Sequence, residues 1–195
     1  METCLFLYGS AGTGKTLILF EGLKIKLSQL LSQGRRVRIL ATGFYDYDTR
    51  ELLNNFTNKY LMNMKNIEVM GLKKLCSELN IKYAYNTPRD TINRVITSLS
   101  EKYPDEVTIL LVDEVWPCYY KQTTTDWRDL EVRENVIWLL GLSPSAYRAT
   151  STEVLPPVNS SVLTRHLITK HRNCPQIRNF IKTISTKIYL SEIFI

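Results

Sequence analysis

The sequence has no long hydrophobic run and few side chains that bind metals. None of its apolar stretches approaches the roughly 18 residues that a transmembrane helix needs. Its 4 cysteines are far apart along the chain, and its 2 histidines, His166 and His171, do not complete a zinc set with any of them. We therefore expect the cysteines to be reduced thiols. We expect no disulfide scaffold, no zinc site and no membrane-spanning helix.

Other absences narrow the class of protein further. The N-terminus has no basic region, with Glu2 at its second position, so no signal peptide is predicted and an intracellular protein of the cytoplasm or nucleus is expected. Internal repeats and low-complexity tracts are also missing. The 195 residues, 44% apolar and 23% charged, suit one globular domain. The net charge of +6 permits a polyanionic partner without requiring one.

A glycine-rich octapeptide near the N-terminus matches the pattern G-x-x-x-x-G-K-[ST]. In this pattern the glycines let the backbone curl so that several N–H groups point at one anion. The lysine reaches the β- and γ-phosphates, and the hydroxyl of the last residue ligates Mg²⁺. The pattern predicts a phosphate-binding loop (P-loop) for a nucleoside triphosphate, made by Gly9, Ser10, Ala11, Gly12, Thr13, Gly14, Lys15 and Thr16.

The residues on either side of this loop predict the setting that it requires. Apolar residues 4–8 come before it, and residues 17–24 follow with helical periodicity. A strand, a loop and a helix in that order place the phosphate on the N-terminus of the helix. We therefore expect ATP and Mg²⁺ as ligands, with Thr16 as one ligand of the metal.

Beyond the loop, segments typical of strands alternate with segments typical of helices. Strands are predicted at 36–41, 66–70, 107–112, 135–140 and 163–168, and helices at 49–62, 72–79, 88–103 and 176–184. The stretch 143–161 is rich in Ser, Thr and Pro and predicts a long loop. This alternation predicts an α/β fold with a parallel sheet that binds ligands at the carboxyl ends of its strands.

An acidic pair, Asp113 and Glu114, follows the most strand-like run of the chain. Residues 107–112 are continuous, apolar and largely β-branched, as expected for a central strand covered on both faces. We expect Asp113 to hold Mg²⁺ through water, at the tip of a strand beside the one that leads into the P-loop. Glu114 is the candidate general base that polarises the attacking water.

With these two motifs, the chain resembles the first RecA-like domain of superfamily 1 helicases. Residues 39–42 with 50–52, residues 67–75, and residues 169–173 followed by Ile177 and Phe180 are similar to further segments of that family. The resemblance implies a three-layer α/β/α P-loop NTPase with a mainly parallel, RecA-like sheet over residues 1–186. The apolar end, 187–195, is expected to be a separate tail that is either cut short or docks on a partner.

The resemblance also implies a third catalytic residue beside Lys15 and Glu114. The family's arginine in the segment at 169–173 contacts the γ-phosphate, and the matching residue here is Arg172. Charge develops on the γ-phosphoryl oxygens during transfer, so a guanidinium placed there accelerates the reaction by several orders of magnitude. The alternative for Arg172 is a surface arginine near the start of a helix.

The chain departs from the family pattern in four places. Val115 and Trp116 follow the acidic pair where the family has a small residue and a glutamine, and residues 141–145 lack the family's Asp and Gln. Residues 44–48 offer aromatic side chains for stacking on bases, but their two aspartates would repel phosphates, so packing or a solvated loop is the better interpretation. The fourth departure is that a second motor domain and an adenine-reading glutamine are missing from the sequence.

These departures leave three functions open. The first is an ATP-binding domain that hydrolyses ATP weakly or only with a partner. The second is a non-catalytic regulatory or scaffold module, in which ATP binding orders residues 143–161 for a partner. The third is a fragment of a motor that acts on single-stranded nucleic acid and is completed by a second motor domain on another chain. Helicase activity of this chain alone is not expected.

Overall fold

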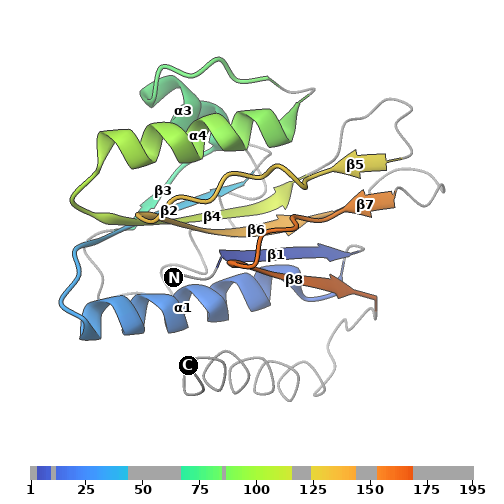
Figure 1. Cartoon of the computed structure of the whole chain (residues 1–195), viewed down its shortest axis with the longest axis horizontal. Helices are drawn as coiled ribbons and strands as arrows, with labels where there is room; N and C mark the ends of the chain where they lie inside the picture. The colour runs from blue at the N-terminus through green and yellow to red at the C-terminus, as the bar shows by residue number, and fades with distance from the viewer. Residues whose placement is uncertain are drawn as a thin grey trace.

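Six parallel strands form the central sheet of the protein. The structure is a computed structural model that describes residues 4–9, 12–43, 67–84, 87–115, 124–143 and 153–168. The strand order is β3-β2-β4-β6-β1-β8 (Figure 1), and every pairing in this sheet is parallel. The strands are β1 (Cys4–Gly9), β2 (Val37–Gly43), β3 (Ile67–Val69), β4 (Val107–Val115), β6 (Val136–Leu142) and β8 (Val162–Leu167). The predicted α/β fold with its mainly parallel sheet is thus confirmed.

The described helices cover both faces of this sheet. Helix α1 (Lys15–Ser32) lies on one face, while α3 (Leu72–Glu78) and α4 (Pro88–Lys102) lie on the other (Figure 1). Pro88 stands in the first turn of α4, where its missing N–H costs no hydrogen bond. The helices predicted at 49–62 and 176–184 fall outside the described residues. None of the described helices combines the length and the apolar composition needed to cross a bilayer.

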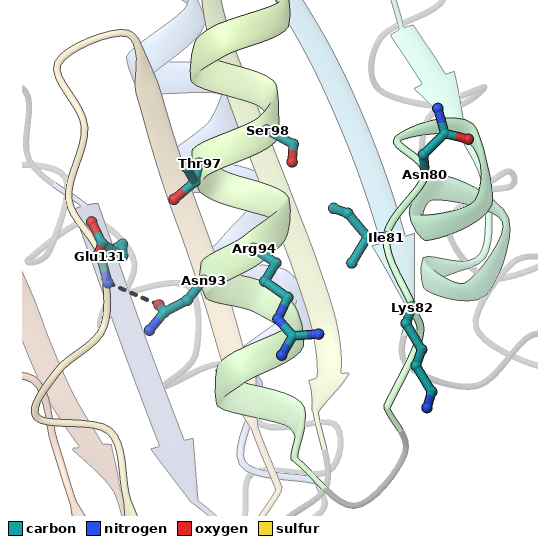
Figure 2. Close-up of a pocket in the computed structure, with 8 residues that line it drawn as sticks. All are labelled: Asn80, Ile81, Lys82, Asn93, Arg94, Thr97, Ser98 and Glu131. Atoms are coloured by element: carbon teal, nitrogen blue, oxygen red, sulfur yellow. Dashed lines mark hydrogen bonds between the residues drawn. The ribbon is translucent and has the colours of Figure 1, made fainter.

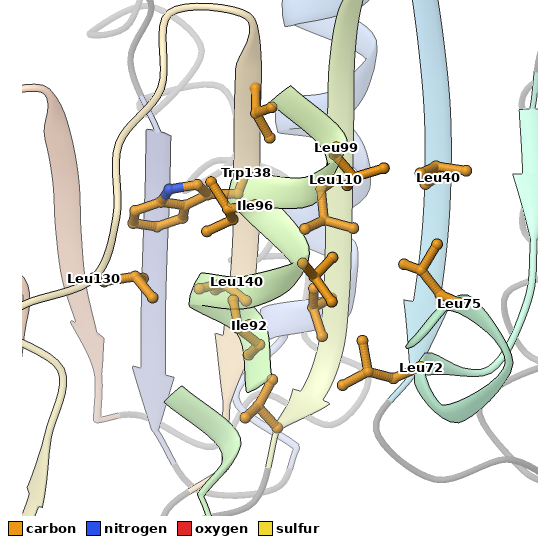
Figure 3. Close-up of a cluster of buried hydrophobic side chains, with 14 of the residues drawn as sticks. Leu40, Leu72, Leu75, Ile92, Ile96, Leu99, Leu110, Leu130, Trp138 and Leu140 are labelled. Carbon is orange, nitrogen blue, oxygen red and sulfur yellow. The ribbon is translucent and has the colours of Figure 1, made fainter. Parts of the chain in front are cut away.

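Two hydrophobic cores, one on each face, explain why the inner strands β1, β4 and β6 are apolar along most of their length. Leu5 and Leu7 of β1 belong to the core under α1, whereas Phe6 of the same strand belongs to the core under α4. Figure 3 shows the second core, where Ile96 of α4 lies with Trp138 of β6 and other large side chains. Because side chains alternate between the faces of a strand, a strand covered on both sides has no polar face.

Two features of the fold contradict the sequence-based expectations. Strand β6 lies between β4 and β1, so the expectation that the acidic pair follows a strand directly beside the P-loop strand is wrong. Strands β5 (Thr124–Asp126) and β7 (Glu153–Leu155) form a second, two-stranded parallel sheet. The prediction of one long loop at 143–161 is therefore wrong at β7. Strands of three residues are too short to leave a periodic signal.

The core under α4 contains a hydroxyl that makes no hydrogen bond. Thr108 is fully buried, and its Oγ1 has no hydrogen-bond partner among the described residues. We expect Thr108→Val to raise the free energy of unfolding by about 1 kcal/mol, because it removes a desolvated polar group whose hydrogen bond is not made. Urea denaturation measures the change.

Thr91 provides the matched control for this prediction. It is equally buried, but its Oγ1 donates a hydrogen bond to the carbonyl oxygen of Ala84 at 3.1 Å. Thr91→Val breaks that bond, so it should lower the free energy of unfolding by about 1 kcal/mol or more. A loss of stability in Thr108→Val as large as that in Thr91→Val would contradict the prediction.

Candidate functional site

The P-loop segment joins β1 to α1 as predicted, with glycines where the backbone requires them. Gly12 and Gly14 have φ angles of 79° and 88°, in the left-handed region that side chains disfavour. Helix α1 begins at Lys15, and Gly14 before it provides no side chain to cap the helix. Thr13 is buried. Ser10 and Ala11 lie outside the described residues.

Lys15 lies inside this segment rather than on the surface. Its side chain is 4% exposed, and its Nζ donates a hydrogen bond of 2.9 Å to the carbonyl oxygen of Gly9. Burial lowers the pKa of Lys15, while the nearby Glu114 and Asp113 carboxylates oppose this shift. The predicted phosphate-binding lysine and both predicted acids therefore share one electrostatic environment.

A hydrogen bond connects the P-loop helix directly to the acidic pair. The Thr16 hydroxyl donates to Oδ2 of Asp113 at 2.5 Å, although the two residues are 97 positions apart. The connection spans the intervening strand because α1 packs across β1, β6 and β4. A hydroxyl that donates its proton to a carboxylate keeps its lone pairs for a cation, so the geometry suits the roles predicted for both residues.

Asp113 is fully buried and accepts a second hydrogen bond, of 2.9 Å, from the backbone N–H of Glu114. Burial raises the pKa of Asp113 to about 6, although the Thr16 hydrogen bond lowers it. The negative charge of Glu114 adds to the rise. A carboxylate that is desolvated in this way favours a nearby cation, which would restore part of the lost solvation.

Strand β4 does not end before the acidic pair, as the sequence predicted, but continues through it with a β-bulge. Val112 pairs with Leu140 and Val115 with Leu142, so Asp113 and Glu114 together lie opposite one residue, Gly141. The backbone of the bulge departs from strand geometry at Glu114, whose φ angle is 54°. The predicted end of the strand at residue 112 is therefore wrong, although the acids still lie within the last three residues of β4.

The bulge changes the direction of the second acid. Consecutive residues of a regular strand point to opposite faces. Here Val112 and Val115 both belong to the core under α4, so both acids between them are directed to the α1 face. Their shared Coulombic effect on Lys15 agrees with this arrangement. One extra residue in the strand thus brings two carboxylates to the side of the sheet that carries Lys15 and Thr16.

Gly141 is a residue of the site that sequence reasoning missed. A Cβ atom at Gly141 would lie 2.8 Å from Oδ1 of Asp113 and 2.9 Å from Cδ1 of Leu19. The glycine therefore leaves the space that the Asp113 carboxylate occupies. A signal was present in the sequence, since a glycine within an apolar strand often marks a bulge or a close approach.

Ser143 is the second residue that sequence reasoning missed. Its Oγ donates a hydrogen bond of 2.9 Å to Oε2 of Glu114, and its backbone N–H donates to the carbonyl oxygen of Val115 at 2.9 Å. The sequence showed only that the family's Asp and Gln are missing near this position. Nothing in the spacing of Glu114 and Ser143 indicates that their side chains meet.

The described residues of the site include side chains of the kind that bind Mg²⁺. The arginine that was predicted to contact the γ-phosphate is not among them. Arg172 lies outside the described residues. Within the described ranges, no group of three or more His, Cys, Asp or Glu side chains could bind a metal by itself. A Mg²⁺ site does not need such a group, because Mg²⁺ usually takes one or two protein oxygens and completes its shell with phosphates and water. The Thr16 hydroxyl and the Asp113 carboxylate are two such oxygens.

A polar groove of about 400 Å³ lies away from these residues, between α4 and the chain that follows α3 (Figure 2). None of the predicted site residues lines it. Asn93 of α4 is held there by the Glu131 N–H, which donates a hydrogen bond of 2.9 Å to its side-chain oxygen. The eight lining residues are Asn80, Ile81, Lys82, Asn93, Arg94, Thr97, Ser98 and Glu131.

Comparison with known proteins gives no relative for this chain. No protein-family model matches it, and no curated protein or solved structure shows a significant match. The chemistry open to the site therefore follows from its own residues. They are a buried lysine at a glycine-rich turn, a hydroxyl bonded to a buried carboxylate, and a second carboxylate held by a serine.

Proposed function

We propose that this chain is an ATP-binding P-loop domain that hydrolyses ATP with Mg²⁺, weakly or with the help of a partner. The observation that carries the proposal is the hydrogen bond between Thr16 and Asp113. It joins the two halves that ATP hydrolysis on a P-loop requires, the phosphate loop and the acid that holds the metal. Helices on both faces of the parallel sheet support a three-layer α/β/α P-loop NTPase with a RecA-like sheet.

The first turn of α1 is suited to bind the phosphates. Its N-cap, Gly14, makes no side-chain hydrogen bond to the helix, and the turn contains no acidic residue. The N–H groups of a helix's first turn and the positive end of the helix dipole both favour an anion. Lys15 adds a positive charge directly beside them. Its hydrogen bond to Gly9 holds the ammonium group over the turn that the phosphates would enter.

The two acids would have different roles in hydrolysis. Thr16 and Asp113 would hold Mg²⁺, which when bound neutralises charge on the β- and γ-phosphate oxygens. Glu114, directed to the same face by the bulge, would accept a proton from the attacking water as general base. Arg172 remains the proposed donor of positive charge to the γ-phosphate.

Lys15→Ala tests this proposal. We expect the variant to hydrolyse ATP about 10²–10³-fold more slowly than the wild type, because it loses the charged donor that stabilises the transferring phosphoryl group. Hydrolysis is measured as the single turnover of radiolabelled ATP with excess protein and Mg²⁺.

Lys26→Ala is the control for this test. Lys26 is also a buried lysine of α1, 5% exposed, but it lines a small apolar cavity with Cys4, Leu139 and Leu163. Its replacement should leave the rate unchanged. Equal rates in the wild type and Lys15→Ala would refute the assignment.

A non-catalytic nucleotide-dependent regulatory or scaffold module is the second candidate. It is favoured by the sequence at the end of β6, which lacks the glutamine that senses the γ-phosphate in superfamily 1 helicases. Tight binding of ATP without measurable hydrolysis, even when single-stranded nucleic acid is present, would support this candidate over the first. Stimulation of hydrolysis by single strands, with a steep dependence on salt, would instead support a motor that another chain completes.

A further inference from the structure

We propose that Ser143 is a positioning residue that holds the general base Glu114 in its reactive orientation. The inference rests on the proposed function, since it assigns Ser143 a part in the same hydrolysis. It concerns a residue at the end of β6, at a position where the sequence offers none of the family's polar residues.

The backbone at Glu114 needs support because it adopts an unfavourable conformation. Its φ of 54° lies in the left-handed region, which costs a residue with a side chain about 1–2 kcal/mol. Such a conformation persists only where neighbouring contacts enforce it. The N–H of Ser143 donates to the carbonyl oxygen of Val115, the residue directly after Glu114, and so ties the bulged segment to β6.

The side chain of Glu114 is held by the same serine. A glutamate has three rotatable bonds, so its carboxylate occupies one place only when contacts fix it. The Oγ–H of Ser143, 3% exposed, donates to Oε2 at 2.9 Å. A hydrogen bond to an ionised acceptor is stronger than one between neutral groups. With Oε2 engaged, fewer rotamers are open to the Glu114 side chain, which favours a single orientation of the base.

Orientation of the base matters for the rate because proton transfer requires hydrogen-bond distance to the water. A displacement of about 1 Å in a reacting group can cost about 10²-fold in rate. Ser143 touches neither nucleotide nor metal in this scheme. Its effect should therefore appear in the rate of hydrolysis and not in the affinity for ATP, and it should require a functional Glu114.

A double-mutant cycle in the full chain tests these expectations. Ser143→Ala should lower the single-turnover rate of ATP hydrolysis about 10–100-fold, the range found when residues that orient catalytic ligands are replaced. Its affinity for a fluorescent ATP analogue should match that of the wild type. Ser143→Thr keeps the hydroxyl and should retain most of the rate. In a Glu114→Gln background, Ser143→Ala should cause no further loss, because the group on which it acts is already inactive.

Thr108→Val supplies the matched control, since it removes an equally buried hydroxyl from the neighbouring strand β4 and should not change the rate. A rate in Ser143→Ala within about twofold of the wild type would overturn the proposal, as would an equal loss in the Glu114→Gln background. In both cases the proposed function would still stand if the wild type hydrolyses ATP and Lys15→Ala does so more slowly. A wild-type chain that binds ATP without any turnover, even when single-stranded nucleic acid is present, would overturn both in favour of the non-catalytic module.

Discussion

Replacing Glu114 by glutamine is expected to slow single-turnover hydrolysis of ATP about 10²–10⁴-fold, the usual contribution of a general base. The amide has the shape of the carboxylate, and its oxygen can still accept the hydrogen bond from Ser143. It cannot take up a proton from water. Affinity for ATP with Mg²⁺ should be kept or should rise, because a negative charge near the phosphates is removed. Quench-flow measurement of the rate and titration of a fluorescent analogue separate the two effects.

Glu68→Gln is the control for this experiment. Glu68 lies on β3 at the far side of the sheet and pairs with Arg38, so the same change of charge should not affect hydrolysis there. If Glu114→Gln hydrolyses ATP as fast as the wild type, Glu114 is not the base. If rate and affinity instead fall together, the residue acts in binding and the proposed division of roles is wrong.

Replacing Gly9 by alanine is expected to lower the free energy of unfolding by about 3 kcal/mol, at the upper end of the range for overpacking. Gly9 is paired with Leu167 in the parallel ladder between β1 and β8. A Cβ atom at Gly9 would lie 2.3 Å from the carbonyl oxygen of Leu167. Because the backbone fixes the position of a Cβ atom and the neighbouring oxygen is itself backbone, no side-chain rotation relieves this contact. Either β8 or the start of the P-loop must move, so ATP binding should weaken as well. Urea denaturation gives the change in stability.

Gly22→Ala shows whether the loss is specific to the Gly9 contact. Gly22 lies in the middle of α1, and a Cβ atom there would be 3.4 Å from Cδ2 of Leu5, an ordinary contact. Alanine is the better helix former, by up to about 1 kcal/mol, so this variant should be as stable as the wild type or more stable. If Gly9→Ala is as stable as Gly22→Ala, then β1 and β8 move apart here at little cost in free energy, and the prediction is wrong.

Long buried elements were predictable from the sequence because each leaves a continuous or periodic pattern. The apolar runs at 4–8 and 107–112 became β1 and β4, and Pro88 marked the start of α4. The strand–turn–helix setting of the glycine-rich segment was equally accessible, since it depends on residues that are neighbours in the chain. Lys15 and Thr16 are in the predicted segment, and Thr16 meets the predicted metal ligand Asp113.

The other features of the fold and of the candidate site depend on pairing between distant segments. A local sequence pattern carries no information about such pairing. The place of β6 between β4 and β1 follows from how the strands associate and not from the composition of any one of them. The bulge arises because two residues of β4 face one residue of β6, and neither strand shows this alone. The contact of Ser143 with Glu114 in turn depends on the bulge. Sequence reasoning therefore identified the acids but gave neither their common direction nor the residue that holds one of them.

The position of β1 in the sheet has a consequence for the order in which the protein folds. Both neighbours of this strand, β6 and β8, come from the last third of the sequence. Pairing between such distant segments is slow, because a long loop must close before any contact forms. Because β1 precedes both partners in the chain, it is synthesised before them, and its apolar side chains stay uncovered by partner strands until β6 and β8 follow. The proposed nucleotide site, which begins at the end of this strand, is therefore expected to be among the last parts of the described sheet to be completed.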